Sequence, residues 1–205
     1  MVPVSDMLGL VLPRRSRTAP LLVGIDGRSR SGKSTLAALI ARCIQEVVVV
    51  HTDDVAWHHS FFGWSDVLIE GVLRPLRRDG LPLSYTPQPW IERGRSGSIV
   101  IPGGTEIILV EGVGAARREL SNWFDATIWV QTDPDVAMAR TIALDRDPPG
   151  FIDDWMRAEN AHLAADQPWT RASAVVSGEN PVSSDAVRVC LRASDATEPP
   201  GRARL

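Results

Sequence analysis

The sequence predicts an α/β fold in which a doubly wound parallel sheet of about five strands is flanked by helices. Short runs of apolar, often β-branched residues recur along the chain, as expected for strands that are buried on both faces. Segments with apolar residues at helical spacing lie between these runs, and this alternation is typical of βαβ units. The runs predicted as strands are residues 21–25, 47–50, 107–110, 127–130 and 174–176, and residues 187–191 are a candidate sixth.

Helices are predicted between these strands from apolar residues that recur every three or four positions. Asp133 is expected to cap one of them, because Pro134 suits the first helical position and the carboxylate can accept from N–H groups of the first turn. Pro75 is expected to disturb another. The predicted helices are residues 36–44, 65–77, 134–145 and 151–166.

A single domain is expected to span residues 1–205, which is long enough to bury one core. Residues 79–104 are rich in Pro, Gly and Ser, and we interpret them as an insert between a helix and a strand. A β-hairpin is predicted in this insert, around residues 90–91 and 99–101. Residues 192–205 are polar and contain Pro and Gly, so this tail is expected to be loosely held.

Net charge and hydropathy limit the kinds of partner that the protein is expected to bind. The formal net charge is −3, from 22 basic and 25 acidic residues, which gives no overall positive field for nucleic acid. The basic cluster Arg14, Arg15 and Arg17 is interpreted as a solvated arm. No apolar run approaches the roughly 20 residues needed to cross a bilayer. The apolar residues 7–12 are followed rather than preceded by positive charges, unlike a signal peptide. We therefore expect a cytoplasmic protein that binds neither membranes nor nucleic acid.

A phosphate-binding motif follows the first predicted strand. Its two glycines let the loop wrap tightly, so that backbone N–H groups face inward, and the positive end of the next helix points at the same spot. The lysine reaches the β- and γ-phosphates of a nucleotide, and the following hydroxyl ligates Mg²⁺. The motif G-x-x-x-x-G-K-[ST] is matched by Gly27, Arg28, Ser29, Arg30, Ser31, Gly32, Lys33 and Ser34, and Thr35 follows it.

This motif predicts a P-loop that takes ATP and Mg²⁺, with Lys33 also acting in catalysis and Ser34 as a metal ligand. Arg30 stands where many such loops carry a small residue, and the sequence leaves open whether its side chain lies over the phosphates or faces solvent. A GTPase is not indicated, because D-x-x-G occurs only at residues 147–150, in the wrong place, and N-K-x-D is absent.

Acidic residues stand at the ends of the second and third predicted strands. Asp53 and Asp54 follow one, and Glu111 directly follows the other. Ligands of doubly wound sheets bind at the carboxyl ends of strands. We therefore interpret Asp53 as the base for a hydroxyl acceptor, with Asp54 as a contact to the acceptor and the second candidate for the base. Glu111 is expected to act in catalysis, by holding the Mg²⁺ shell or by contacting the acceptor. The alternative for each is a cap on the next element.

The chain resembles the uridine kinase and nicotinamide riboside kinase group of P-loop kinases over about residues 20–180, and among these the bacterial uridine kinase-like ATP-binding proteins. The resemblance rests on the P-loop with its flanks, the strand-end acidic pair and the acidic strand end at Glu111. It implies transfer of the γ-phosphoryl group of ATP to a hydroxyl of a nucleoside-like acceptor. It also implies that Arg140 and Arg146 belong to a lid over the phosphates. Residues 55–57 read Val-Ala-Trp where the group usually has an aromatic pair, so the acceptor stays open.

Aromatic residues are a skewed set, with seven tryptophans against one tyrosine. Trp64, Tyr85 and Trp90 fall in loops or at element ends on the expected acceptor side. They are candidates to contact the acceptor, because aromatic rings stack on flat ligands. Trp129 and Trp155 fit core positions.

Cysteines and histidines are interpreted as structural. Cys43 and Cys190 show neither metal-ligand spacing nor a disulfide framework. Cys43 falls within an apolar helical pattern and is expected in the core. His51 and His162 are likewise interpreted as structural.

Two alternatives to a kinase for a small hydroxyl compound stay open. A nucleoside monophosphate kinase would use Arg74, Arg77 and Arg78 for the acceptor phosphate, although the acidic pair would repel that phosphate. A non-catalytic ATP-binding sensor is the other alternative. The expected partner is a small-molecule acceptor, and a homodimer is a candidate assembly.

Overall fold

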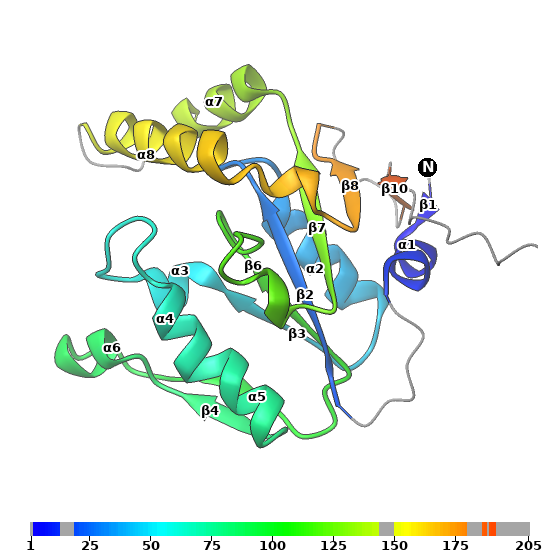
Figure 1. Ribbon diagram of the computed structural model, residues 1–205, viewed down its shortest axis with the longest axis vertical. Helices are drawn as coiled ribbons and strands as arrows, with labels where there is room; N and C mark the ends of the chain where they lie inside the picture. Colours follow the sequence, from blue (N-terminus) through cyan, green and yellow to red (C-terminus); the bar gives the residue numbers. More distant parts are fainter. Residues whose placement is uncertain (1, 13–18, 144–149, 180–185, 188, 192–205) are drawn as a thin grey trace, which may run out of the picture.

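The computed structural model describes residues 2–12, 19–143, 150–179, 186–187 and 189–191. Within them the central sheet has the strand order β10-β8-β7-β2-β6-β3 (Figure 1). Strands from β8 to β3 run parallel, and β10 pairs antiparallel with β8, so the predicted sheet is confirmed. These strands are β2 (Leu21–Gly27), β3 (Val47–His51), β6 (Ile107–Glu111), β7 (Ala126–Gln131), β8 (Ala174–Ser177) and β10 (Val189–Leu191).

The strand order positions the site. From β2 the chain moves to β3 at the sheet edge, returns to β6 beside β2, and then crosses to β7 on the other side of β2. In such sheets the crevice outside the carboxyl ends of the strands opens where the order reverses. The register pairs Glu111 of β6 with Ile25 of β2 and with His51 of β3. The ends of these three strands therefore meet at one edge.

Helices cover both faces of the sheet (Figure 1). Alternate strand residues point to opposite faces, and they divide between two large apolar clusters, one with α1 and α2 and one with α4, α5 and the insert. A smaller cluster packs α8 near β7 and β8. The helices are α1 (Val4–Val11), α2 (Lys33–Cys43), α3 (Thr52–Ala56), α4 (Ser65–Leu68), α5 (Arg74–Arg78), α6 (Gln88–Glu92), α7 (Pro134–Ile142) and α8 (Phe151–Asp166).

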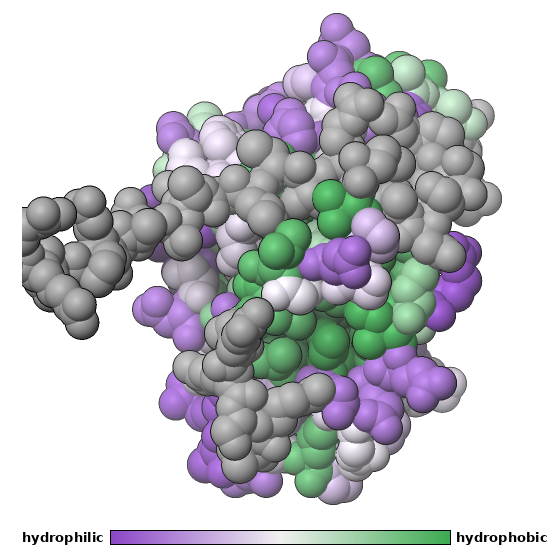
Figure 2. Space-filling view, turned by 90° about the vertical axis from the view of Figure 1, so that its right-hand side faces the viewer, coloured by the Kyte–Doolittle hydropathy of each residue, from purple (hydrophilic) through white to green (hydrophobic). Residues whose placement is uncertain are grey.

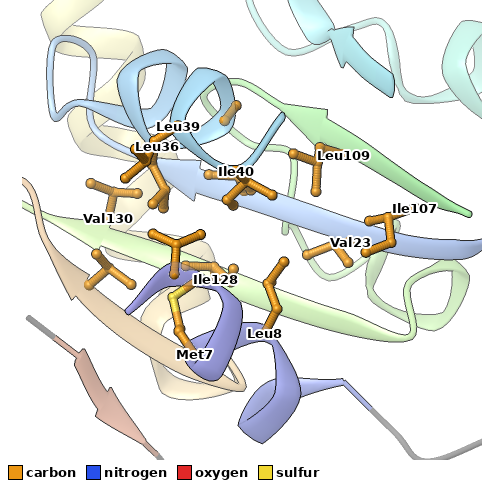
Figure 3. Close-up of a cluster of buried hydrophobic side chains, with 14 residues drawn as sticks. Met7, Leu8, Val23, Leu36, Leu39, Ile40, Ile107, Leu109, Ile128 and Val130 are labelled. Atoms are coloured by element: carbon orange, nitrogen blue, oxygen red, sulfur yellow. The ribbon is translucent and has the colours of Figure 1, made fainter. Parts of the chain in front are cut away.

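The N-terminal helix α1 belongs to the core, although the sequence did not predict it. Met7 and Leu8 are buried against α2 and the apolar side chains of β2, β6 and β7 (Figure 3). The short strand β1 (Val2–Pro3) precedes α1 and pairs antiparallel with β9 (Ala186–Val187). Figure 2 shows this side of the molecule, where hydrophobic residues gather in the middle of the face. A stretch of eight residues was too short for its helical period to be recognised.

The predicted helix at residues 65–77 is present with one irregularity. Helix α4 passes through a π-helical turn, Ile69–Leu73, into α5. Pro75 lies just after this turn, and proline removes a backbone donor from the helical ladder. The helix therefore widens at this turn and then continues. This is the disturbance that was expected from Pro75.

The insert contains a β-hairpin, but the predicted position of its first strand is wrong. Strand β4 (Leu83–Tyr85) pairs antiparallel with β5 (Ile99–Ile101), whereas Trp90 lies in the short helix α6. Two prolines explain the helix, because Pro87 precedes α6 and Pro89 stands in its first turn, where proline is tolerated. Trp90 is buried in the apolar cluster under the insert.

Other sequence predictions differ in detail. Asp133 caps α7 by accepting from the N–H of Asp135 at 2.8 Å, as predicted. Cys43 is exposed rather than buried, because it ends α2 on the side away from the sheet cluster. The arginine cluster at residues 14–17, Arg146 and the tail at residues 192–205 lie outside the described residues. Among the helices that are described, none has the length and apolar character needed to cross a bilayer.

Replacing Met7 by alanine should lower the free energy of unfolding by about 2–5 kcal/mol, because the side chain is fully buried and its removal leaves a cavity. Leu10→Ala is the matched control on the same helix. Leu10 is 61% exposed, so its removal should change stability by no more than about 0.5 kcal/mol. Urea unfolding followed by circular dichroism measures both. Equal effects would contradict the placement of α1 in the core.

Candidate active site

A cleft of about 350 Å³ opens at the carboxyl ends of β2, β3 and β6. One part of its lining comes from the P-loop and the strand ends, and the other from the loop before α4 and from α7 and α8. The lining residues are Ser29, Arg30, Lys33, Ser34, Thr52, Asp53, Ala56, Phe61, Trp64, Glu111, Gly112, Val113, Thr141, Phe151, Ile152 and Trp155.

The P-loop leads from β2 into α2. Gly32 has a φ of 103°, a left-handed conformation that glycine adopts without a steric penalty, and α2 begins at the next residue. The N–H of Ser31 donates to the carbonyl of Arg28 at 3.0 Å, which closes the loop on itself. Thr35 follows in the first turn of α2 and does not line the cleft.

Lys33 places a buried positive charge at this loop. Its side chain is 7% exposed, and Nζ donates to the carbonyl of Arg28 at 2.7 Å. Burial lowers the pKa of Lys33, and the nearby carboxylates of Asp26 and Glu111 act in the opposite direction. Phosphate oxygens are stronger acceptors for an ammonium group than a carbonyl is. The loop therefore suits an anionic ligand.

Glu111 joins the P-loop to the end of β3. Its carboxylate accepts from the hydroxyl of Ser34 at 3.1 and 3.3 Å and lies 2.7 Å from Nδ1 of His51. Burial alone would raise the pKa of Glu111, but the hydrogen bond from His51 and the charge of Lys33 outweigh it, and the pKa is lowered. The same hydrogen bond raises the pKa of His51. His51 does not line the cleft, but it contacts Glu111 and so supports a residue of the site.

Asp53 and Asp54 point to different surroundings, although they are adjacent at the start of α3. Asp53 lines the cleft, and burial within it, followed by the like charge of Glu111, raises the pKa of Asp53. Asp54 does not line the cleft and forms an ion pair with Arg95 at 2.6 Å. Of these two carboxylates, only Asp53 therefore faces the cleft.

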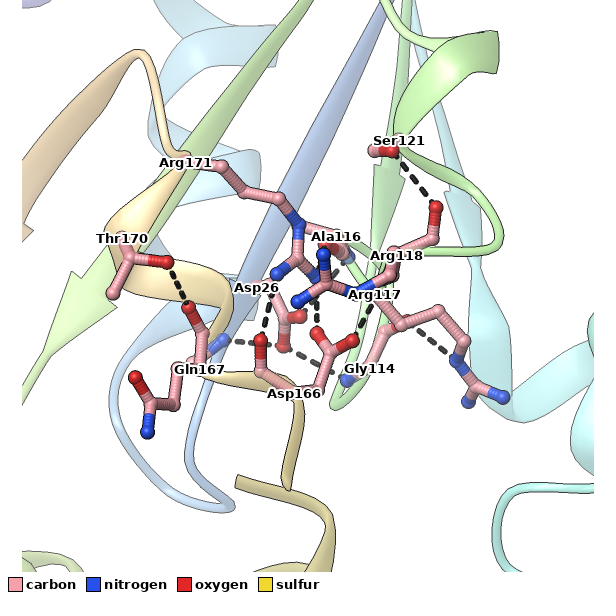
Figure 4. Close-up of polar contacts among 11 residues, drawn as sticks. Asp26, Gly114, Ala116, Arg117, Arg118, Ser121, Asp166, Gln167, Thr170 and Arg171 are labelled. Carbon is pink, nitrogen blue, oxygen red and sulfur yellow. Dashed lines mark hydrogen bonds and ion pairs between the residues drawn. The ribbon is translucent and has the colours of Figure 1, made fainter. Parts of the chain in front are cut away.

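Asp26 is buried directly beneath the P-loop. Its carboxylate accepts from the backbone N–H groups of Gly27, Gly114 and Ala116 at 2.7, 2.8 and 2.9 Å (Figure 4). Burial raises the pKa of Asp26, and these N–H groups and Lys33 offset part of that shift. The residue thus holds the start of the P-loop to the loop after β6. Sequence analysis did not single it out, although it stands at a strand end.

Glu159 of α8 supports the P-loop from the other side. Its carboxylate is 1% exposed and accepts from the N–H of Ser29 at 2.6 Å and from the guanidinium of Arg28 at 3.4 Å. Arg28 also donates to the side chain of Asn160 at 2.7 Å. These contacts join residues about 130 positions apart, so no local sequence signal pointed to them.

Arg140 lies at the P-loop but faces its backbone. Its guanidinium donates to the carbonyl of Arg30 at 3.1 Å and to that of Gly178 at 3.0 and 3.1 Å, and it does not line the cleft. Arg30 itself is exposed, lines the cleft and has a φ of 58°. Arg140 therefore fixes the loop in this structure, and Arg30 is the arginine with access to a ligand.

The aromatic candidates separate into two groups. Trp64 lines the cleft, although it is only 1% exposed. Tyr85 and Trp90 do not line it: Tyr85 packs against Gly71, and the indole N–H of Trp90 donates to the carbonyl of Asp54 at 2.9 Å. Trp155 was expected in the core and lines the cleft instead.

The donor set fits Mg²⁺ accompanied by a nucleotide. No group of three or more His, Cys, Asp or Glu side chains in the described part of the chain could hold a metal by itself. Mg²⁺ commonly takes one or two protein oxygens and completes its shell with phosphates and water. Ser34 and Glu111, whose oxygens lie 3.1 Å apart, are such a pair beside the P-loop.

Comparisons with known proteins agree with this geometry. No family model matches the chain. A uridine kinase of Geobacillus kaustophilus is 25% identical over 144 residues, which cover 62% of this chain and 67% of that protein. A uridine kinase of Clostridium novyi is 28% identical over 142 residues, with shares of 62% and 68%.

A solved structure shows the same fold. The structure of a possible uridine kinase from Bacillus stearothermophilus matches with a TM-score of 0.57 at 24% identity, over 84% of this chain and 94% of that one. The P-loop at the end of β2, the parallel sheet and these similarities together identify a P-loop kinase. In sequence the chain is similar to uridine kinases, and in fold it is similar to a possible uridine kinase.

Proposed function

We propose that this protein transfers the γ-phosphoryl group of ATP to a hydroxyl of a nucleoside-like small molecule. One observation carries the proposal: the cleft that contains the P-loop cation Lys33 also contains Asp53, a carboxylate with a raised pKa. A phosphate-binding loop alone fits many nucleotide-binding proteins, but a carboxylate facing the same space can receive a proton from an acceptor. Similarity to uridine kinases supports the nucleoside-like character of the acceptor.

The proposed reaction needs positioning and charge neutralisation from the protein. The acceptor oxygen forms a bond to the γ-phosphorus, the bond from that phosphorus to the β–γ bridging oxygen breaks, and ADP leaves with the electron pair. The hydroxyl proton passes to Asp53. Lys33 stabilises the charge on the phosphates, and Arg30 is the second cation that lines the cleft.

Mg²⁺ is the proposed metal, and Ser34 and Glu111 would hold it. When bound, it neutralises charge on the phosphate oxygens. His51 keeps the carboxylate of Glu111 oriented by the hydrogen bond at 2.7 Å, and the lowered pKa keeps that carboxylate ionised. Outer partners of this kind commonly orient metal-binding residues.

A nucleoside monophosphate kinase is less well supported. The arginines considered for the acceptor phosphate are engaged elsewhere: Arg74 pairs with Glu70, Arg77 with Asp125 and Arg78 with Asp79, at 2.7–2.9 Å. None of the three lines the cleft. An acceptor phosphate near Asp53 and Glu111 would be repelled.

An ADP-release assay with nucleosides and their 5′-monophosphates at equal concentration tests the proposed function, and faster release with monophosphates would overturn it. A pure sensor would release no ADP with any acceptor.

Lys33→Ala should weaken binding of Mg·ATP by about 10- to 100-fold, because a charge-assisted hydrogen bond to phosphate contributes about 1.5–3 kcal/mol. Calorimetry measures the affinity. Arg42→Ala, at the far end of the same helix, removes a positive charge as well and should leave the affinity unchanged. Lys33 is also the only lysine in the sequence, so lysine labelled with carbon-13 at Cε alone gives one side-chain resonance. That resonance should shift on ATP addition, and an unmoved signal would contradict the P-loop assignment.

Asp53→Asn should lower ADP release by about 10²- to 10⁴-fold with the best acceptor of the screen, because an amide cannot take the proton. ATP affinity should persist. Asp54→Asn is the matched control, since Asp54 is paired with Arg95 outside the cleft, and a change of only a few-fold is expected. If Asp53→Asn lowered ADP release only slightly and Asp54→Asn lowered it strongly, the base would be Asp54.

The pH dependence follows from the raised pKa of Asp53. A base acts in its ionised form, so kcat/KM should fall as the pH drops through a value above the ordinary pKa of aspartate. Carbon-13 NMR of the Asp53 carboxyl in the ligand-free protein gives that pKa directly. Glu111→Gln should lower it, because one like charge is removed, while burial keeps it above the ordinary value. Titration of Asp53 at or below the ordinary value would disprove the assignment of this carboxylate as a base tuned by its cleft.

A further inference from the structure

The cleft has two chemically different halves. Its charged lining residues belong to the P-loop or to the two strand ends: Arg30, Lys33, Asp53 and Glu111. Among the described residues, the opposite half is lined by no charged side chain. Apart from Thr141 that half is apolar. Besides the buried Trp64 it includes three half-buried or exposed aromatic side chains, Phe61, Phe151 and Trp155, which we call the aromatic wall.

The aromatic wall is packed against itself. Phe61 meets Phe151 edge to face at 5.6 Å between ring centroids, and it meets Trp155 edge to face at 5.1 Å. Phe62 stacks on Trp155 at 5.8 Å and on His162 at 4.3 Å. Aromatic pairs in these arrangements attract one another beyond the burial of their area. The wall is therefore formed in advance of any ligand, and Phe151 remains 39% exposed.

Helix α8 holds this wall against the phosphate-binding part of the site. Phe151, Trp155 and Glu159 are spaced four residues apart and lie on one side of the helix. Glu159 is bonded to the P-loop through the N–H of Ser29. The wall and the loop therefore keep a fixed relation through one helix.

The C-terminal end of α8 is attached to the loop after β6. Asp166 accepts from the N–H of Arg118 at 3.0 Å and pairs with Arg171, which donates to the carbonyl of Ala116 at 2.8 Å (Figure 4). The same loop is held by Asp26 through Gly114 and Ala116. Helix α8 is thus tied to the P-loop near its middle and to the loop after β6 at its C-terminal end.

The insert offers no comparable surface. Tyr85 is packed on Gly71, and the ring of Trp90 is covered by the guanidinium of Arg95 at 3.5 Å from its centroid. Arg95 is itself paired with Asp54. The aromatic residues of the insert are therefore already used in packing, and none lines the cleft.

We propose that the aromatic wall on α8, with Trp155 and Phe61 as the contacting rings, determines acceptor specificity, and that it selects alcohols attached to a flat ring without negative charge. This inference rests on the proposed kinase function and deepens it. The ring lies against the wall, which carries no charge, while the hydroxyl reaches Asp53 in the charged half of the cleft. Specificity then resides in α8 and residue 61 rather than in the insert at residues 79–104.

A matched pair of acceptors tests the ring. Uridine and methyl β-D-ribofuranoside share the sugar and its hydroxyls, but the second has a methoxy group in place of the flat base. Stacking of a base on an aromatic side chain contributes about 1–3 kcal/mol, so kcat/KM should favour uridine by about 10-fold or more. Adenosine, pyridoxine and thiamine extend the ring series. If kcat/KM for the riboside without a base equals that of every alcohol with a flat ring, the proposal is overturned.

Variants test the residues. Trp155→Ala and Phe61→Ala should each reduce the ratio of kcat/KM between the best ring alcohol and the riboside by about 10-fold, and Trp155→Phe should retain most of it. Trp169→Phe is the control, because Trp169 packs on Trp129 and does not line the cleft. A ratio lost in Trp90→Phe and kept in Trp155→Ala would place specificity in the insert and overturn the proposal.

A binding measurement separates this inference from the proposed function. Calorimetry on the Asp53→Asn variant with ATP present needs no turnover. Suppose that the affinity for ring alcohols depends on Trp155 but the wild type releases no ADP. This result would uphold the aromatic wall and refute the kinase function. ADP release with no dependence of affinity or selectivity on Trp155 would uphold the kinase function and refute the wall. Retained ATP binding in each variant shows that it is folded.

Discussion

The site depends on a buried carboxylate at the end of β2. Asp26 accepts three backbone N–H groups, from the first residue of the P-loop and from two residues of the loop after β6. Without an acceptor each buried N–H would cost about 1–3 kcal/mol. The arrangement brings two glycine-containing loops together beneath the cleft, with Lys33 close enough to offset part of the charge. The geometry of Glu111 and Ser34 follows, since each is only a few residues from one of these loops.

Much of the fold was predictable because strands buried on both faces leave an unambiguous apolar pattern. The five parallel strands and α8 lie where the sequence predicted them. The P-loop was recognisable because its chemistry needs fixed residue types at fixed spacing. Strand-end logic also identified Asp53 and Glu111 as candidates. If every polar residue at the carboxyl end of a strand is taken as a candidate, Asp26 and His51 are included as well. Their side chains contact residues of the site.

The rest of the site was not predictable from local pattern. Glu159 contacts a residue 130 positions away, and only the tertiary structure brings the two together. The helical spacing of Trp155 shows which side of α8 it shares with Phe151, but the same spacing serves a core and an apolar cleft equally well. Trp90 was misplaced for a related reason: a tryptophan near the expected acceptor side reads as a ligand contact, whereas in the folded chain it is buried by Arg95. Distinguishing such roles requires knowing what covers each ring.

The two halves of the cleft have different origins, and this limits what similarity to uridine kinases implies. The charged half is built on strand ends whose positions are set by the hydrogen-bonded register of β2, β6 and β3. The phosphate chemistry can therefore be retained wherever the sheet is retained. The aromatic wall comes from α8 and from the loop before α4, which are attached to that sheet by side-chain contacts such as Glu159 with Ser29. Under the proposal above, substitutions in the wall would alter the acceptor without disturbing the donor. For the proposed reaction, similarity in fold would therefore constrain the phosphoryl donor more tightly than the molecule that receives the phosphate.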